Sequence, residues 1–189
     1  MRLLLIAITG TLIFWPLPTQ SQVQDLNNVH YDLTQSGNHY TIRGTFFVRS
    51  NPNCLLHIFY DFEHLSHIVT EADSLILLRK GEDWYDVAYI YHCLLLKGRV
   101  VYRKTLIQEK MKVSFEMIDS DQRRSLLPKV VSSAGYYEIK PEKDGYRVIY
   151  WQEGLVADAW STKIFFPLLE KETTKFLHGL KDYVERTCN

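Results

Sequence analysis

Short runs rich in apolar and aromatic residues recur from residue 74 to residue 154, and such runs predict β-strands. Polar or glycine-containing segments such as Gly81-Glu82-Asp83 and 141–145 separate the apolar runs, as tight turns do. Strands joined in this way form an antiparallel meander. We therefore expect six strands, at residues 74–80, 84–96, 99–109, 112–119, 129–140 and 146–154.

One strand and two short helices are expected before this meander. Residues 40–49 alternate in the manner of a strand. Asn51 can cap a helix and Pro52 suits its first turn, so residues 54–60 are expected to be helical. A second short helix is expected over residues 62–69.

The end of the chain has the three- and four-residue spacing of an amphipathic helix, with Pro167 suited to its first turn. The predicted fold class is therefore α+β: a seven-stranded antiparallel sheet, two short helices after the first strand and a long C-terminal helix. A long sheet twists and curls, so the helix can cover its concave face. Space left beneath such a helix suits an apolar ligand. The apolar side of the helix consists of Leu169, Thr173, Phe176, Leu177, Leu180 and Val184.

The N-terminus has the pattern of a secretory signal peptide. Arg2 precedes the apolar runs 3–8 and 12–15, and small residues precede a plausible cleavage site near Gln22. An uncleaved N-terminal anchor is the alternative. We expect an exported protein, periplasmic or secreted. The expected parts are a signal peptide at 1–21, an N-terminal arm or weak strand at 22–39 and one domain at 40–189.

Charge and cysteine content narrow the choice of partners. The chain has 22 Lys+Arg and 22 Asp+Glu, so no net charge attracts it to nucleic acid. Of three cysteines, Cys54 opens a predicted helix, Cys93 lies in a predicted strand and Cys188 is near the end of the chain. In an oxidising compartment one pair can form a disulfide. We hypothesise a bond between Cys54 and Cys188; three unpaired cysteines are the alternative.

Three short motifs follow one another at informative positions. The first is an apolar helix followed by Asp61-Phe62 and Leu65, within residues 55–68. The second is Gly135-Tyr136-Tyr137-Glu138-Ile139, followed by 145–150, and the third is Phe166-Pro167 before the long helix. In this order they resemble the START/Bet v 1-like (SRPBCC) superfamily of polyketide cyclase/dehydrase and lipid-transport proteins. The resemblance covers residues 40–187.

The resemblance implies a helix-grip fold whose cavity binds a lipid, sterol, quinone or polyketide. It supplies no shared set of catalytic residues. Two positions depart from the usual pattern, with Tyr137 in place of Trp and Ser66 in place of Pro.

Candidate ligand-binding residues are large side chains that share a strand face or the inner side of the helix. Core packing is the alternative role for each of them. They are Tyr85, Tyr89, Tyr91, Phe115, Met117, Tyr137, Tyr150, Trp160, Phe176 and Leu180. Arg103 and Glu116 fall within strands and are expected to face solvent. Leu155, Val156 and Trp160 are a candidate rim for transient membrane contact.

No recognised catalytic motif is present, so we expect no catalytic residue, no metal and no cofactor. His64 and His67, three residues apart, are a weak candidate zinc site and are interpreted as solvated side chains. The leading prediction is an exported carrier for a hydrophobic small molecule or lipid. Two alternatives remain: a cyclase-, aromatase- or isomerase-type enzyme, and a protein-interaction module with a filled cavity. The oligomeric state is not determined by these features.

Overall fold

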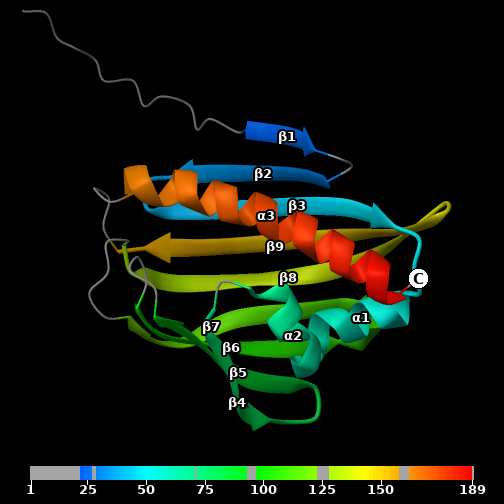
Figure 1. Ribbon diagram of the computed structural model, residues 1–189, viewed down its shortest axis with the longest axis horizontal. Helices are drawn as coiled ribbons and strands as arrows, with labels where there is room; N and C mark the ends of the chain where they lie inside the picture. The colour runs from blue at the N-terminus through cyan, green and yellow to red at the C-terminus, as the bar shows by residue number, and fades with distance from the viewer. Residues whose placement is uncertain are drawn as a thin grey trace, which may run out of the picture.

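One open antiparallel sheet forms most of the protein. The computed structural model describes residues 22–26, 29–70, 72–92, 97–122, 128–157 and 162–188. Within them, nine strands pair in the order β1-β2-β3-β9-β8-β7-β6-β5-β4 (Figure 1). The strands are β1 (Gln22–Leu26), β2 (Val29–Ser36), β3 (His39–Val48), β4 (Ser74–Lys80), β5 (Trp84–His92), β6 (Lys97–Ile107), β7 (Lys112–Gln122), β8 (Val130–Glu142) and β9 (Gly145–Val156).

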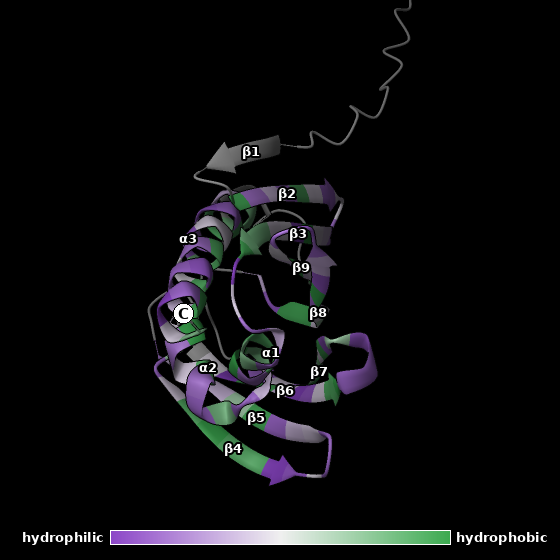
Figure 2. Cartoon of the chain, turned by 90° about the vertical axis from the view of Figure 1, so that its right-hand side faces the viewer, coloured by the Kyte–Doolittle hydropathy of each residue, from purple (hydrophilic) through white to green (hydrophobic). Residues whose placement is uncertain are grey.

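Three helices lie on the concave side of this sheet, which curls around them (Figure 2). They are α1 (Pro52–Tyr60), α2 (Phe62–Ile68) and α3 (Thr162–Cys188), and a short 3-10 turn η1 (Gln108–Lys110) joins β6 to β7. Asn51 caps α1, because its side chain accepts the backbone N–H groups of Asn53 and Cys54. The α+β helix-grip arrangement predicted from the sequence is therefore present.

The strand count differs from the expected seven. Residues 22–36, expected as an arm or weak strand, form β1 and β2 at one edge of the sheet. A two-residue turn joins β2 to β3, and its Gly37 has φ +61°, a conformation that favours glycine. Only Val29 and Tyr31 of β2 are fully buried, so most positions of this strand are polar and lack the alternation that predicts a strand. The helix α3 also begins before Pro167, which lies within it.

The core lies between α3 and the strands at the centre of the sheet. Leu177, Leu180 and Val184 of α3 are at most 1% exposed and pack against the inner side chains of β3 and β9. Gly44 of β3 allows this close approach, since a Cβ atom there would lie 2.6 Å from a Leu177 methyl carbon. No helix within the described ranges is long and apolar enough to cross a membrane.

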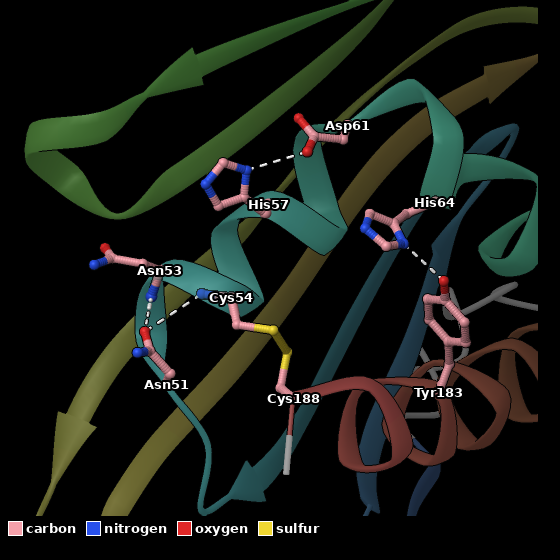
Figure 3. Close-up of a disulfide and its surroundings, with 8 residues drawn as sticks. All are labelled: Asn51, Asn53, Cys54, His57, Asp61, His64, Tyr183 and Cys188. Atoms are coloured by element: carbon pink, nitrogen blue, oxygen red, sulfur yellow. Dashed lines mark hydrogen bonds and ion pairs between the residues drawn. A yellow bond between two sulfur atoms is a disulfide. The ribbon is translucent and has the colours of Figure 1, made fainter.

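A disulfide joins the first helix to the last. It links Cys54 of α1 to Cys188 of α3, with Cα atoms 5.8 Å apart (Figure 3). Nearby, His64 Nδ1 of α2 lies 2.7 Å from the Tyr183 hydroxyl of α3, and the His67 ring stacks on Tyr183. The three helices are thus connected to one another over the concave face. The third cysteine, Cys93, lies outside the described residues.

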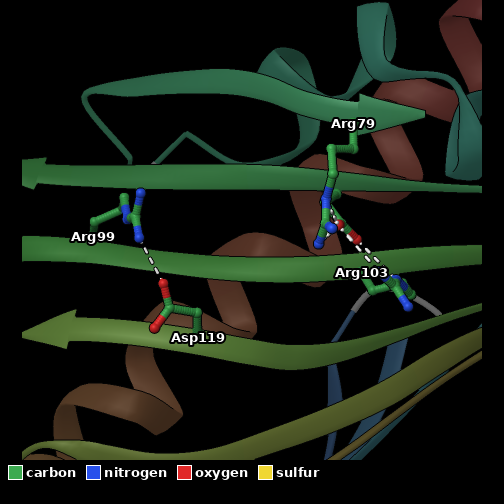
Figure 4. A network of polar contacts seen from close by, with 5 residues as sticks. Arg79, Arg99, Arg103 and Asp119 are labelled. Atoms are coloured by element: carbon green, nitrogen blue, oxygen red, sulfur yellow. Dashed lines mark hydrogen bonds and ion pairs between the residues drawn. The ribbon is translucent and has the colours of Figure 1, made fainter.

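A cluster of ion pairs occupies the opposite, outer face of β4–β7 (Figure 4). Asp86 is fully buried and its carboxylate accepts N–H groups from Arg79 and Arg103 at 2.6–3.1 Å. The Arg103 guanidinium also lies 4.3 Å from the centre of the Trp84 ring. Arg103 lies on this outer, solvent-facing side, as expected, with 39% of its side chain exposed and its guanidinium bonded to the Asp86 carboxylate. Arg99 and Asp119 form a second, exposed pair.

Candidate ligand-binding cavity

A cavity of about 250 Å³ lies between the concave face of the sheet and α3. Its size is close to the lower end of the range of small-molecule sites, roughly 300–1,000 Å³. Aromatic side chains from five strands and the helix dominate its wall. The lining residues are Val69, Tyr89, Tyr91, Tyr102, Lys104, Phe115, Tyr137, Tyr150, Gln152, Leu169, Glu172, Thr173 and Phe176.

Strand alternation brings these aromatic side chains onto one face. Phe115 of β7 lies near Tyr137 of β8 and Tyr150 of β9, with ring centres 5.7 and 6.1 Å apart, and Tyr150 in turn contacts Phe176 of α3 at 5.2 Å. Gly135 pairs with Phe115 across the strands, and a Cβ atom there would lie 2.4 Å from the Phe115 ring. Glycine at this position therefore lets the ring lie across the sheet at the cavity wall.

The tyrosine hydroxyls of the cavity are neutral donors. Burial raises the pKa of Tyr89, Tyr102, Tyr137 and Tyr150 above the ordinary value near 10. Tyr150 donates to the side-chain oxygen of Gln152. The protons stay on these phenols at physiological pH, so the hydroxyls of Tyr89, Tyr102 and Tyr137 can donate to an acceptor on a ligand.

The one ammonium group of the cavity belongs to Lys104, a residue only 2% exposed. Its Nζ donates to the backbone carbonyl of Phe59 at 2.7 Å, near the end of α1, and lies 5.6 Å from the centre of the Tyr137 ring. Among the described residues, no carboxylate lies within ion-pair distance of it. Burial lowers the pKa of Lys104 to about 7, and the charge of Asp61 only partly opposes this shift. The cavity therefore contains a buried amine for which the described part of the chain supplies no counter-ion.

Six of the residues selected from the sequence line this cavity: Tyr89, Tyr91, Phe115, Tyr137, Tyr150 and Phe176. Tyr85 lies on the same strand face but packs into a separate cluster with Leu65 of α2, outside the cavity. Leu180 is a core residue beneath α3. Met117 lines a different hollow, and Trp160 lies outside the described residues.

The wall also contains residues that the sequence reading missed, above all Tyr102, Lys104 and Gln152. Lys104 falls between Tyr102 and Leu106 in the two-residue period of β6, on the face that a strand buries. A lysine at an apolar position of this kind is the signal that could have identified it. Val156, expected at a membrane-facing rim, is only 1% exposed and belongs to the core.

Metal binding receives no support from the histidines. His64 and His67 both contact Tyr183, as described above, so they are not simply solvated. In the part of the chain that the structure describes, no group of three or more His, Cys, Asp or Glu residues could hold a metal ion.

Several solved structures share this architecture at low sequence identity. The Zhui aromatase/cyclase from Streptomyces sp. R1128 matches with a TM-score of 0.65 and 10% identity, over 78% of this chain and 94% of that one. The STAR-related lipid transfer protein from Xanthomonas axonopodis matches with 0.59 and 11%, over 88% and 97%. Norcoclaurine synthase from Thalictrum flavum, in complex with dopamine and hydroxybenzaldehyde, matches with 0.57 and 16%, over 78% and 85%. Neither a protein-family model nor a curated protein sequence matches the chain.

The arrangement of a curled sheet, two short helices and a long C-terminal helix over a cavity defines a helix-grip protein. Its fold is that of the START/Bet v 1-like superfamily, as the resemblance in the sequence predicted. Identities of 9–16% establish the fold alone.

Proposed function

We propose that this protein is a carrier that holds a hydrophobic small molecule in the cavity beneath α3. The observation that supports the proposal best is the cavity itself, an aromatic-lined space at the position where sheet and helix separate. Burying apolar ligand surface there gains about 25 cal/mol per Å². The fold neighbours include a protein named for lipid transfer, which agrees with this role.

The polar groups of the cavity suggest what the ligand carries. Lys104 and the neutral tyrosine hydroxyls are donors, and Glu172 of α3 is the ionisable acid among the lining residues. A ligand with a carbonyl or carboxylate group would give the Lys104 ammonium a second acceptor besides the Phe59 carbonyl, and a carboxylate would also supply a counter-ion. Charge-assisted hydrogen bonds of this kind are roughly twice as strong as neutral ones.

The carrier is proposed to act outside the cytoplasm. The N-terminal pattern of a signal peptide supports this location. The disulfide between Cys54 and Cys188 agrees with it, since disulfides persist mainly in oxidising compartments.

Native mass spectrometry of the protein isolated from its own compartment, followed by solvent extraction, tests this function. We expect one apolar molecule for each chain. Replacing Thr173, a buried residue of the cavity wall, by Trp should fill the space and abolish the bound mass. Lys171→Trp, on the exposed side of the same helix, is the matched control and should retain the ligand. A wild-type chain that carries no ligand and takes up none from a panel of lipids, quinones and aromatic carbonyl compounds would contradict the proposal.

An enzyme of the cyclase, aromatase or isomerase class is the second candidate, and Lys104 is the observation that favours it. A buried amine with a pKa near 7 can donate or accept a proton at physiological pH. Incubation of the extracted ligand class with the protein, followed by mass spectrometry of the products, separates the two candidates. A carrier returns the ligand unchanged, whereas an enzyme gives a product that Lys104→Met no longer forms.

A further inference from the structure

The sheet is interrupted between β7 and β8. These neighbouring strands pair over only five residues, from Lys112 opposite Glu138 to Glu116 opposite Ala134. Beyond that point β7 continues to Gln122 paired only with β6, and the first residues of β8, from Val130, pair only with β9. Each of these two segments therefore pairs with its outer neighbour in the sheet, but no backbone hydrogen bonds join the two segments to each other.

A register shift accompanies the interruption on each side. The register of β6 and β7 shifts so that Ile118 has no partner, and the register of β8 and β9 shifts so that Val131 has none. These two residues are also among the few large apolar side chains on the surface, 41% and 51% exposed. Two bulges and two exposed apolar residues therefore flank the same interruption.

The far end of the interruption is closed by a side chain. Gln122 Nε2 donates to the Val130 carbonyl at 2.9 Å, and the Val130 N–H donates to Gln122 Oε1 at 3.0 Å. The side-chain amide reproduces the two hydrogen bonds that a strand neighbour would make. The backbone ladder closes one end of the interruption at Glu116 and Ala134, and Gln122 closes the other at Val130. We call the enclosed gap between β7 and β8 the window.

A hollow of about 380 Å³ lies at this window, lined in part by Met117, Ser132 and Ser133. Side chains that line it contact side chains that line the cavity. Gln152 lines the cavity, and its Nε2 donates to Ser133 Oγ at 2.9 Å and to Tyr40 Oη at 3.4 Å, both on the hollow side. Met117 pairs across the strands with Tyr102 of the cavity wall.

We propose that this window is an access route through the sheet to the cavity, controlled by Met117 and by the hydrogen bonds of Gln152. The inference rests on the proposed function, because the traffic it serves is an apolar ligand. Met117 is unbranched and can change rotamer at low energetic cost. Each neutral hydrogen bond contributes about 1 kcal/mol net, so the Gln152 contacts can open without unfolding the sheet. Ile118 and Val131 offer an apolar surface at the outer rim.

Thiol labelling tests the route without any ligand. Thr173→Cys, in a Cys93→Ser background that retains the disulfide, places a thiol of similar size to threonine in the cavity wall. The rate of its reaction with methyl methanethiosulfonate is measured in this protein and in versions of it that carry a further substitution at the window. Met117→Ala should accelerate labelling about tenfold, equivalent to about 1.4 kcal/mol. Ser132→Trp, at an exposed position of the hollow, should slow it by a similar factor.

Met111→Ala is the matched control, because it makes the same substitution at a partly buried methionine away from the window. It should change the labelling rate less than twofold. The access route would be overturned if Met117→Ala and Met111→Ala accelerated labelling equally. It would also be overturned if Met117→Ala and Ser132→Trp both left the rate unchanged. The outcome does not depend on ligand binding, so failure of the route and failure of the carrier function are distinguished.

Discussion

Two buried charged residues on neighbouring strands have opposite surroundings. Asp86 of β5 faces the outer side of the sheet, where Arg79 and Arg103 surround its carboxylate. Lys104 of β6 faces the inner side, where its ammonium group has one backbone carbonyl and one aromatic ring as neighbours. The first charge is compensated within the described part of the chain, and the second is not.

The pKa of each group falls, for opposite reasons. Hydrogen bonds from Arg103, aided by Arg79, lower the pKa of Asp86 although burial opposes this shift. These hydrogen bonds therefore favour the charged carboxylate. Burial lowers the pKa of Lys104, which disfavours the charged ammonium. The comparison shows that a buried charge can be part of the scaffold when its partners are present, and a candidate contact for a ligand when they are absent.

Removal of the disulfide has the largest expected effect on stability, and the bond lies on the same side of the sheet as Lys104. The bond spans 134 residues between α1 and α3, and α1 supplies the carbonyl that holds Lys104. The double variant Cys54→Ser/Cys188→Ser should lose about 4 kcal/mol of unfolding free energy in urea. Cys93→Ser is the control and should unfold close to the wild type. A double variant as stable as the wild type would show that the bond does not restrain the chain.

Asp86→Asn tests the contribution of the compensated charge to stability. It removes one charge from between two arginines, and we expect a loss of about 2 kcal/mol, less than for a fully enclosed pair because water reaches both guanidinium groups. Asp119→Asn is the matched control, since its pair with Arg99 is exposed on both sides and should contribute less than about 1 kcal/mol. Equal losses in the two variants would contradict the special role of Asp86.

The pH dependence of this contribution has a definite sign. Because the pKa of Asp86 is lower in the folded chain, its stabilisation is present above the unfolded value near 3.9 and is lost as pH falls through the folded value. Urea unfolding below pH 4 should therefore show a steeper fall for the wild type than for Asp86→Asn.

Lys104 should give a smaller effect per pH unit, spread over several units of the alkaline range. Its pKa is about 7 in the folded chain and near 10.4 in the unfolded one, so the unfolded chain binds the extra proton between these values. Stability contributed by this group should rise with pH across that window, by at most about 1.4 kcal/mol per pH unit. Lys104→Met should remove this slope while Lys110→Met, at an exposed position of η1, should not. A wild-type slope identical to that of Lys104→Met would contradict the buried amine.

Much of the fold was predictable because its signals are local. Apolar and aromatic runs separated by turn residues within 74–154 predicted the meander, and the cap at Asn51 with Pro52 marked the first helix. The strand β2, second from the edge of the sheet, was harder to recognise, since only part of one face is buried and its polar residues obscure the period of two. Such a strand forms because of its pairing with neighbouring strands, and its own sequence shows only a weak β pattern.

The cavity was predictable in its aromatic character but not in its polar groups. Tyr89 and Tyr137 could be assigned to inner faces from the period of two, yet that period does not show where a cavity ends, so Tyr85 was included as well. The environment of Lys104 depends on Phe59 and Tyr137, which are 45 and 33 residues away in the sequence. Such long-range contacts determine whether a charge is compensated, and no local pattern shows them.

The most direct test of this account is the titration of Lys104 in the folded protein, followed by NMR of the lysine side-chain methylene carbons and assigned with Lys104→Met. The account predicts a midpoint near pH 7, because a buried ammonium without a counter-ion is destabilised. A midpoint near 10.4, the value of a solvated lysine, would show that Lys104 is compensated or reaches water, and the cavity would then lack its proposed contact for an acceptor group.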